Sequence, residues 1–167
     1  AGDALTTGWS NVAIGYLALS TEDTGSDSIA IGRAALSVQN YDGSSYNIAI
    51  GRDAGKAVTT GYKNTVVGGR SLQASTTSYE NVAIGYQALF TNVEGSKMVA
   101  IGGNALVNLN PSSAGEFFNV AVGYAAGYTS TTSSNNVFVG GLTAYANTTG
   151  SSTVSYTHLT LPTIYSV

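Results

Sequence analysis

Residues 11–20 read NVAIGYLALS and residues 81–90 read NVAIGYQALF, so the chain contains nearly the same ten-residue segment twice. Aligned on its glycine, the motif recurs eight times, at Gly15, Gly32, Gly51, Gly68, Gly85, Gly102, Gly123 and Gly140. The spacings are 17, 19, 17, 17, 17, 21 and 17 residues. A fixed period with occasional insertions is typical of a solenoid, in which extra residues can leave one coil without disturbing its neighbours.

Each copy contains a short apolar segment typical of a β-strand. The residue directly before the glycine and the residue two positions earlier are β-branched in all eight copies, beginning with Ile14 and Val12. Alternate residues of a strand face the same side, so we expect these two columns to point into the coil and form its core. The column between them is mostly Ala, beginning with Ala13, and we expect it to face outward against other copies of the chain.

Three further features complete the predicted coil. Asn or Ser opens most copies, as at Asn11 and Ser28, where a side-chain amide can bond the stacked neighbour. The glycine suits a turn with positive φ, and a later Leu, such as Leu19, supplies a third core residue. We expect residues 20–27, 37–46 and 107–118 to protrude as loops. The sequence therefore predicts an all-β solenoid of about eight parallel coils over residues 1–153.

The repeats NVAIGYLAL, SIAIGRAAL, NIAIGRDAG, NVAIGYQAL and MVAIGGNAL resemble the head repeats of trimeric autotransporter adhesins, the YadA-like head. The resemblance covers about residues 1–150. It implies a left-handed parallel β-roll, assembled as a homotrimer and displayed outside a Gram-negative bacterium as a virulence-associated adhesin. It also implies attachment to host or environmental surfaces through a protein or glycan receptor.

Similar repeats also occur in phage tail fibres, so a tail-fibre shaft or receptor-binding segment of a virion is the alternative. Two copies depart from the Val-Ala-Ile core, at Thr65–Val67 and Val137–Val139. The period is also longer than in the compact form of the adhesin repeats. These departures do not distinguish the two kinds of fibre, which share the repeat.

The composition argues against several other classes of function. Of 167 residues only 9% are charged, and the formal net charge is −3, so the chain lacks the basic surface that nucleic acids or anionic membranes attract. It contains no cysteine, which excludes a disulfide scaffold or a zinc–thiolate site, and no apolar run long enough to insert into a membrane. The first residue is Ala rather than Met, and we interpret the chain as part of a longer protein.

Two short motifs match catalytic signatures only superficially. The DTGS segment at Asp23–Ser26 matches the loop of aspartic proteases, but polar residues precede it where an apolar strand is needed. The GRDAGKA segment, residues 51–57, is one residue too short for a phosphate-binding loop. A solenoid enzyme that degrades polysaccharide would need clustered carboxylates, whereas Asp and Glu are scattered here. We therefore predict no enzyme, no cofactor, and no catalytic, cofactor-binding or metal-binding residue.

The residue after each repeat glycine forms a column of Tyr, Arg and Gly. Its members are Tyr16, Arg33, Arg52, Gly69, Tyr86, Gly103, Tyr124 and Gly141. Such a column suits stacking on sugars or contact with a partner surface. The alternative is packing between subunits or in the groove between coils.

The repeat ends before the C-terminus. The period predicts a ninth glycine near position 157, where Thr157 stands. The segment VSYTHLTLPT, from Val154, resembles the translated reading frame of an adapter ligated to DNA fragments during library preparation, so we interpret residues 154–167 as a non-native tail. The alternative is a genuine strand, because Val154, Tyr156 and His158 alternate.

Overall fold

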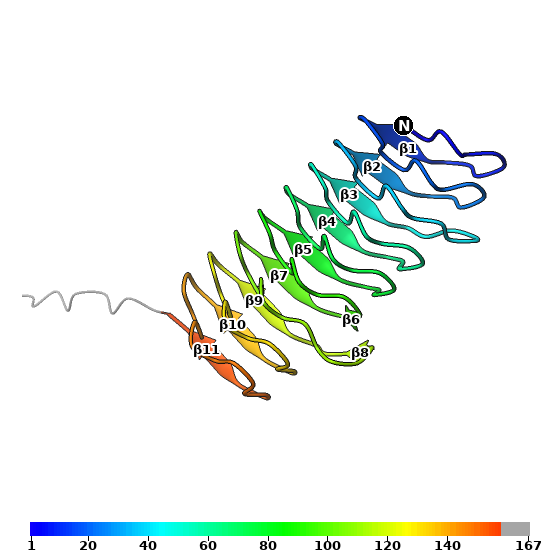
Figure 1. Cartoon of the computed structure of the whole chain (residues 1–167). Coiled ribbons are helices and arrows are strands. Elements are labelled where there is room, and N and C mark those ends of the chain that lie inside the picture. The colour runs from blue at the N-terminus through cyan, green and yellow to red at the C-terminus, as the bar shows by residue number, and fades with distance from the viewer. Residues whose placement is uncertain (158–167) are drawn as a thin grey trace, which may run out of the picture.

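The computed structural model describes residues 1–157, which form a stack of parallel strands without a helix (Figure 1). Each strand of the main sheet pairs in register with the next, as Val82 does with Val99. In sheet order the nine strands are β1 (Val12–Ile14), β2 (Ile29–Ile31), β3 (Ile48–Ile50), β4 (Thr65–Val67), β5 (Val82–Ile84), β7 (Val99–Ile101), β9 (Val120–Val122), β10 (Val137–Val139) and β11 (Val154–Tyr156). The predicted all-β parallel solenoid is confirmed, with nine strands in the main sheet instead of eight.

Each coil turns at the repeat glycine, as the sequence predicted. Gly85 has a φ of 129°, and a Cβ atom there would lie 2.6 Å from the carbonyl carbon and oxygen of Gly102 in the next coil. The same close approach recurs along the stack, for example between Gly51 and Gly68. Both the positive φ and the lack of space for a side chain therefore require glycine after the first eight strands of the main sheet.

The predicted orientation of the strands is wrong. Ala30, Ala49 and Ala83 are completely buried inside the coil, whereas Ile14 is 58% and Val139 45% exposed. The cause is the thinness of the coil. After the glycine the chain folds back directly over its own strand, so the inner face of the strand meets the Leu column, and only a small side chain fits between the two segments.

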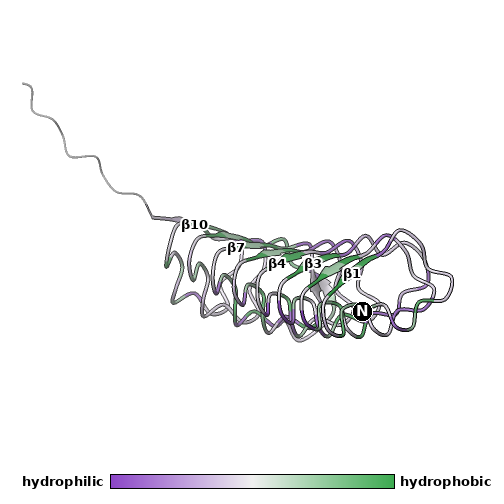
Figure 2. Ribbon diagram, turned by 90° about the horizontal axis from the view of Figure 1, so that it is seen from above, coloured by the Kyte–Doolittle hydropathy of each residue, from purple (hydrophilic) through white to green (hydrophobic). Residues whose placement is uncertain are grey.

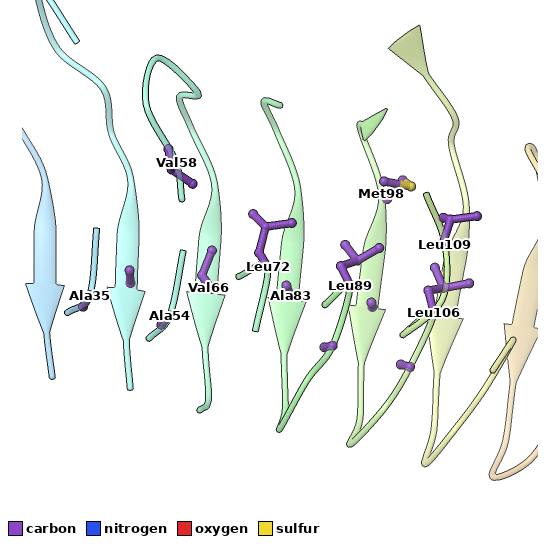
Figure 3. Packing of buried hydrophobic residues seen from close by; sticks show 14 of the residues in the cluster. Ala35, Ala54, Val58, Val66, Leu72, Ala83, Leu89, Met98, Leu106 and Leu109 are labelled. Carbon is purple, nitrogen blue, oxygen red and sulfur yellow. The ribbon is translucent and has the colours of Figure 1, made fainter. Parts of the chain in front are cut away.

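The core is a row of aliphatic side chains that stack from coil to coil. Figure 3 shows Leu72, Leu89 and Leu106 stacked in this way beside Ala83. Phe138 is the largest residue of the mostly Ala column and is also completely buried. Gly127 replaces Leu in the neighbouring coil, and a Cβ atom there would lie 2.8 Å from the Phe138 ring. The missing Leu side chain therefore provides the volume that the Phe occupies.

A ladder of buried asparagines joins consecutive coils. The Asn81 side chain donates from Nδ2 to the carbonyl of Gly95 at 2.9 Å, and its Oδ1 accepts from the N–H of Met98 at 3.0 Å. Asn11, Asn47, Asn64, Asn119 and Asn136 repeat one or both of these bonds. The predicted role of the asparagines is confirmed: they pair backbone groups at the corners that no sheet bond reaches.

In the second copy of the repeat, a serine stands at the position of the ladder asparagine. Ser28 takes the place of Asn, and the Gln39 side chain donates to its Oγ at 2.8 Å. Asn47 in turn donates to Gln39 Oε1 at 2.8 Å. Gln39 also donates to the buried carboxylate of Glu22 at 3.0 Å. The glutamine thus substitutes for the missing asparagine and keeps these buried polar groups paired.

The loop predictions are confirmed only where residues are inserted. Asp42 and Gly43 are exposed, as are residues 112–114, whereas Pro111 is buried. At the second of these corners β6 (Gly95–Ser96) pairs with β8 (Gly115–Glu116) in a second small sheet, and at the first Ser26 and Ser44 form a single parallel bridge. Residues 20–27 do not protrude: Glu22 and Gly25 are buried, because a coil of 17 residues has none to spare.

The stack continues past the boundary that the sequence suggested at residue 153. Strand β11 pairs in register with β10, and the N–H of Thr157 donates to the carbonyl of Val139 at 3.1 Å. Residues Val154–Tyr156 thus form the ninth strand of the main sheet, and the interpretation of this segment as non-native stays a prediction. The rest of the predicted non-native tail, residues 158–167 with His158, lies outside the described residues, and its origin stays a prediction.

Candidate functional site

A distinctive surface is the outward side of the nine-stranded sheet, which we call the outer face. It consists of the first and third residues of each strand, from Val12 and Ile14 in β1 to Val154 and Tyr156 in β11. Except for Thr65 and Tyr156 these residues are all Val or Ile. Figure 2 shows the resulting apolar colour along the strands from one end of the stack to the other.

The outer face is apolar, continuous and uncharged. Val12 is 40%, Ile50 38% and Val137 38% exposed in the single chain. Nine strands at about 4.8 Å spacing make it roughly 38 Å long. Scattered exposed apolar residues are normal on a protein surface, but a continuous apolar patch marks a site of contact with another molecule. The outer face is therefore the candidate interaction site.

The Tyr and Gly of the column after the repeat glycine pack on one another between coils. A Cβ atom at Gly69 would lie 3.6 Å from the Tyr86 ring, and one at Gly103 would lie 3.5 Å from the Tyr124 ring. Glycine therefore leaves room for the aromatic ring of the next coil. Tyr86 and Tyr124 thus pack in part in the groove between coils, but they remain 54% and 62% exposed, so contact with a sugar or a partner surface stays a prediction.

Neither catalytic motif forms a reactive arrangement. In the DTGS segment the Asp23 carboxylate accepts from the N–H of Thr24 at 2.8 Å, within an ordinary corner of the coil. The GRDAGKA segment lies along the return side of the third coil, where Asp53 pairs with Arg52 at 3.2 Å. Among residues 1–157, no group of three or more His, Asp or Glu side chains could share a metal ion. No helix suited to spanning a membrane occurs in that same range.

Stacked tyrosines on two of the corners were not predicted. The rings of Tyr62 and Tyr79 lie 5.2 Å apart and nearly parallel, and those of Tyr128 and Tyr145 lie 5.0 Å apart. Both pairs are separated by one 17-residue period, a signal that the sequence contained. Tyr41 joins the first pair at 5.8 Å from Tyr62. Tyr41 and Tyr62 are 21 residues apart because the chain between them contains an insertion, so the 17-residue period does not predict their contact.

A polar cluster lies beside the first tyrosine stack. Lys97 Nζ is 2.7 Å from Glu116 Oε1, and the Tyr79 hydroxyl donates to the same oxygen at 3.1 Å. The hydrogen bond with Lys97 lowers the pKa of Glu116, and the same bond raises the pKa of Lys97. Donation to the Glu116 carboxylate raises the pKa of the Tyr79 hydroxyl. The three side chains thus link corners that are 37 residues apart in sequence.

We expect the Lys97→Met variant to raise the pKa of Glu116 toward the ordinary value of 4.5, measured by NMR titration of the carboxyl carbon. Because the folded-state pKa of Glu116 is lowered, its stabilising contribution is present above the ordinary Glu pKa and is lost as pH falls through the folded value. Because the folded-state pKa of Lys97 is raised, its own stabilising contribution is lost only as pH rises above that residue's ordinary pKa of 10.5. An unchanged Glu116 pKa in the variant would contradict the assignment, and Lys63→Met is the matched control.

No family model, curated protein or solved structure matches the chain. The inference of function therefore starts from the repeat, the outer face and the groups around it.

Proposed function

We propose that this chain is a non-enzymatic structural and adhesive segment of a trimeric fibre that attaches a bacterial surface to host or environmental surfaces. The observation that carries the proposal is the outer face, an uncharged Val and Ile surface that extends along all nine strands. The three-fold assembly and the left-handed coil come from the resemblance of the repeats to the YadA-like head.

Assembly through the outer face has a simple physical basis. Full burial of one Val or Ile side chain contributes about 1.5–3 kcal/mol, and the face offers such side chains on every coil. The interface was expected on the Ala column, but Ala83 and its neighbours lie inside the coil and cannot form it. The Val and Ile columns take that place in the proposal, with three copies meeting along a common axis.

The adhesive role follows from repetition. A fibre with three copies of the chain presents each weak surface contact three times, and many fibres multiply it further into avidity. The stacked coils form a rod whose corners and return sides carry neutral polar groups and few charges. A phage tail-fibre shaft would use the same rod. The coding sequence on either side distinguishes the two: a membrane anchor indicates the adhesin, and a tail-attachment domain indicates the phage.

Sedimentation velocity of the full chain at micromolar concentration tests the proposal. We expect a species of three times the chain mass of 17.0 kDa. Beads coated with this species are expected to adhere to cell surfaces more strongly than beads coated with a monomeric variant. A stable, folded monomer of the unmodified chain, or a dimer, would overturn the trimer and the avidity that depends on it.

A further inference from the structure

Four of the six cationic side chains of this acidic protein gather on three consecutive coils. Arg52 Nε lies 3.2 Å from Asp53 Oδ2, and Arg33 and Lys56 approach Asp53 Oδ1 to 3.9 Å each. Arg70 follows on the next coil, where its backbone N–H donates to the Arg52 carbonyl at 2.8 Å. The three cations beside the Asp53 carboxylate leave a net charge of +2 at this point of a chain whose formal net charge is −3. We call these five residues the basic cluster.

Asp53 lies among the cations but does not form hydrogen bonds with all of them. Its side chain is only 7% exposed, whereas those of Arg33 and Arg52 are 55% and 63% exposed. Asp53 Oδ1 accepts no hydrogen bond within residues 1–157, since its two cationic neighbours are beyond bonding distance. Guanidinium and ammonium hydrogens of the basic cluster therefore face solvent. Like charges held this close favour binding of an anion.

An open apolar hollow adjoins the basic cluster. It has a volume of 390 Å³ and is lined by Val38, Lys56, Ala57, Gln73, Ala74 and Phe90. Ala57 and Ala74 belong to consecutive coils, and the larger Val38 and Phe90 come from the coils on either side. The hollow thus arises where two small side chains lie between two large ones. Lys56 belongs both to the hollow and to the basic cluster.

The hollow also contains an unpaired amide. Gln73 Oε1 has no hydrogen-bond partner among the described residues. A buried amide oxygen without a partner costs free energy, which rotation of the side chain toward a polar ligand would recover. The hollow therefore combines a small apolar surface, an aromatic ring and one amide, next to at least three exposed cations.

We propose that the hollow and the basic cluster together bind an acidic glycan that carries N-acetyl groups. An acetamido methyl group matches the small apolar surface at Ala57 and Ala74, and its amide matches Gln73. The carboxylate or sulfate of an adjoining sugar pairs with Arg33, Arg52 or Lys56, since guanidinium groups bind such anions through two parallel hydrogen bonds.

Cations on successive coils lie about 4.8 Å apart along the rod, close enough for one acidic group of a polymer to contact two of them. An uncharged glycan would leave the basic cluster unpaired, and a purely anionic polymer would leave the hollow empty. This inference rests on the proposed adhesive function, for which it names the class of ligand.

Calorimetric titration of the full chain tests the proposal with four probes. A hyaluronan hexasaccharide carries both carboxylates and acetamido groups, trigalacturonate carries only carboxylates, chitohexaose carries only acetamido groups, and triglutamate is an acidic peptide. We expect the hyaluronan fragment to bind at least about tenfold more tightly than each of the others, as the loss of one charged hydrogen bond or of the apolar contact predicts. Equal binding of any other probe, or no binding of hyaluronan, would overturn the proposal.

Two variants separate the parts of the site. Arg33→Gln with Arg52→Gln is expected to weaken hyaluronan binding by about tenfold or more. The matched control, Lys63→Gln with Lys97→Gln, makes the same change in net charge and is expected to leave the affinity within about twofold, because exposed charges at a distance are screened. Ala74→Leu fills the hollow and is expected to reduce the affinity to that of trigalacturonate. Unchanged affinity in either test variant would overturn the assignment.

Sedimentation of every variant keeps this result distinct from the test of assembly. A monomeric chain that still prefers hyaluronan would overturn the trimer and retain the glycan site. A trimer that does not prefer hyaluronan would overturn the site alone. Should Ala74→Leu lower the unfolding temperature, Ala57→Leu provides a second way to fill the hollow.

Discussion

Replacing Ile84 by Glu is expected to convert the trimer into a folded monomer. Ile84 is the third residue of the central strand β5, and its side chain lies on the outer face. In a trimer the substitution would bring three carboxylates together along an apolar axis without partners. An uncompensated buried charge costs about 3–5 kcal/mol, so we expect the dissociation constant to rise by roughly 150- to 4,000-fold.

Sedimentation velocity measures the dissociation, and circular dichroism reports whether the coil remains folded. Thr77→Glu is the matched control, because Thr77 is exposed at a corner and receives the same charge. Ile84→Val keeps an apolar β-branched side chain and is expected to remain trimeric. A trimer that survives Ile84→Glu would show that the outer face is not the interface.

Replacing Asn81 by Ala is expected to lower the free energy of unfolding by about 2–6 kcal/mol, since it leaves two buried backbone groups unpaired at about 1–3 kcal/mol each. The groups are the N–H of Met98 and the carbonyl of Gly95, and Asn81 itself is completely buried. Both lie at the corner between β5 and the next strand of the stack, so the damage affects pairing between coils.

Urea denaturation at a fixed protein concentration measures this loss. Asn40→Ala is the matched control, because Asn40 is exposed, and its unfolding free energy is expected to change by less than about 0.5 kcal/mol. Equal stability of the two variants would contradict the role assigned to the asparagine ladder. A fall in stability without dissociation would show that the ladder acts within the chain.

The repeat by itself determined the strands, their parallel order and the turns. A strand centred on Ala83 requires only β-branched neighbours and a following glycine, and both are local properties of the sequence. The asparagine ladder was equally predictable, because a column of amides at a constant spacing has stacked partners in any solenoid. The same period places Tyr62 over Tyr79, so this stack too is encoded in the spacing of the repeat.

The tertiary structure alone decided which side of each strand is the core. Successive residues of a strand face opposite sides of the sheet, and here both sides carry apolar residues. The hydrophobic pattern therefore does not show whether Ala or Ile lies inside the coil. The choice depends on the space between a strand and its own return segment, which admits Ala83 opposite the Leu column and excludes Ile84. Stacking likewise brings Arg33, Asp53 and Lys56 together, although the chain separates Arg33 from Asp53 by an inserted coil corner. Such contacts depend on where the inserted residues lie within each coil. The spacing of the repeat glycines does not specify that position.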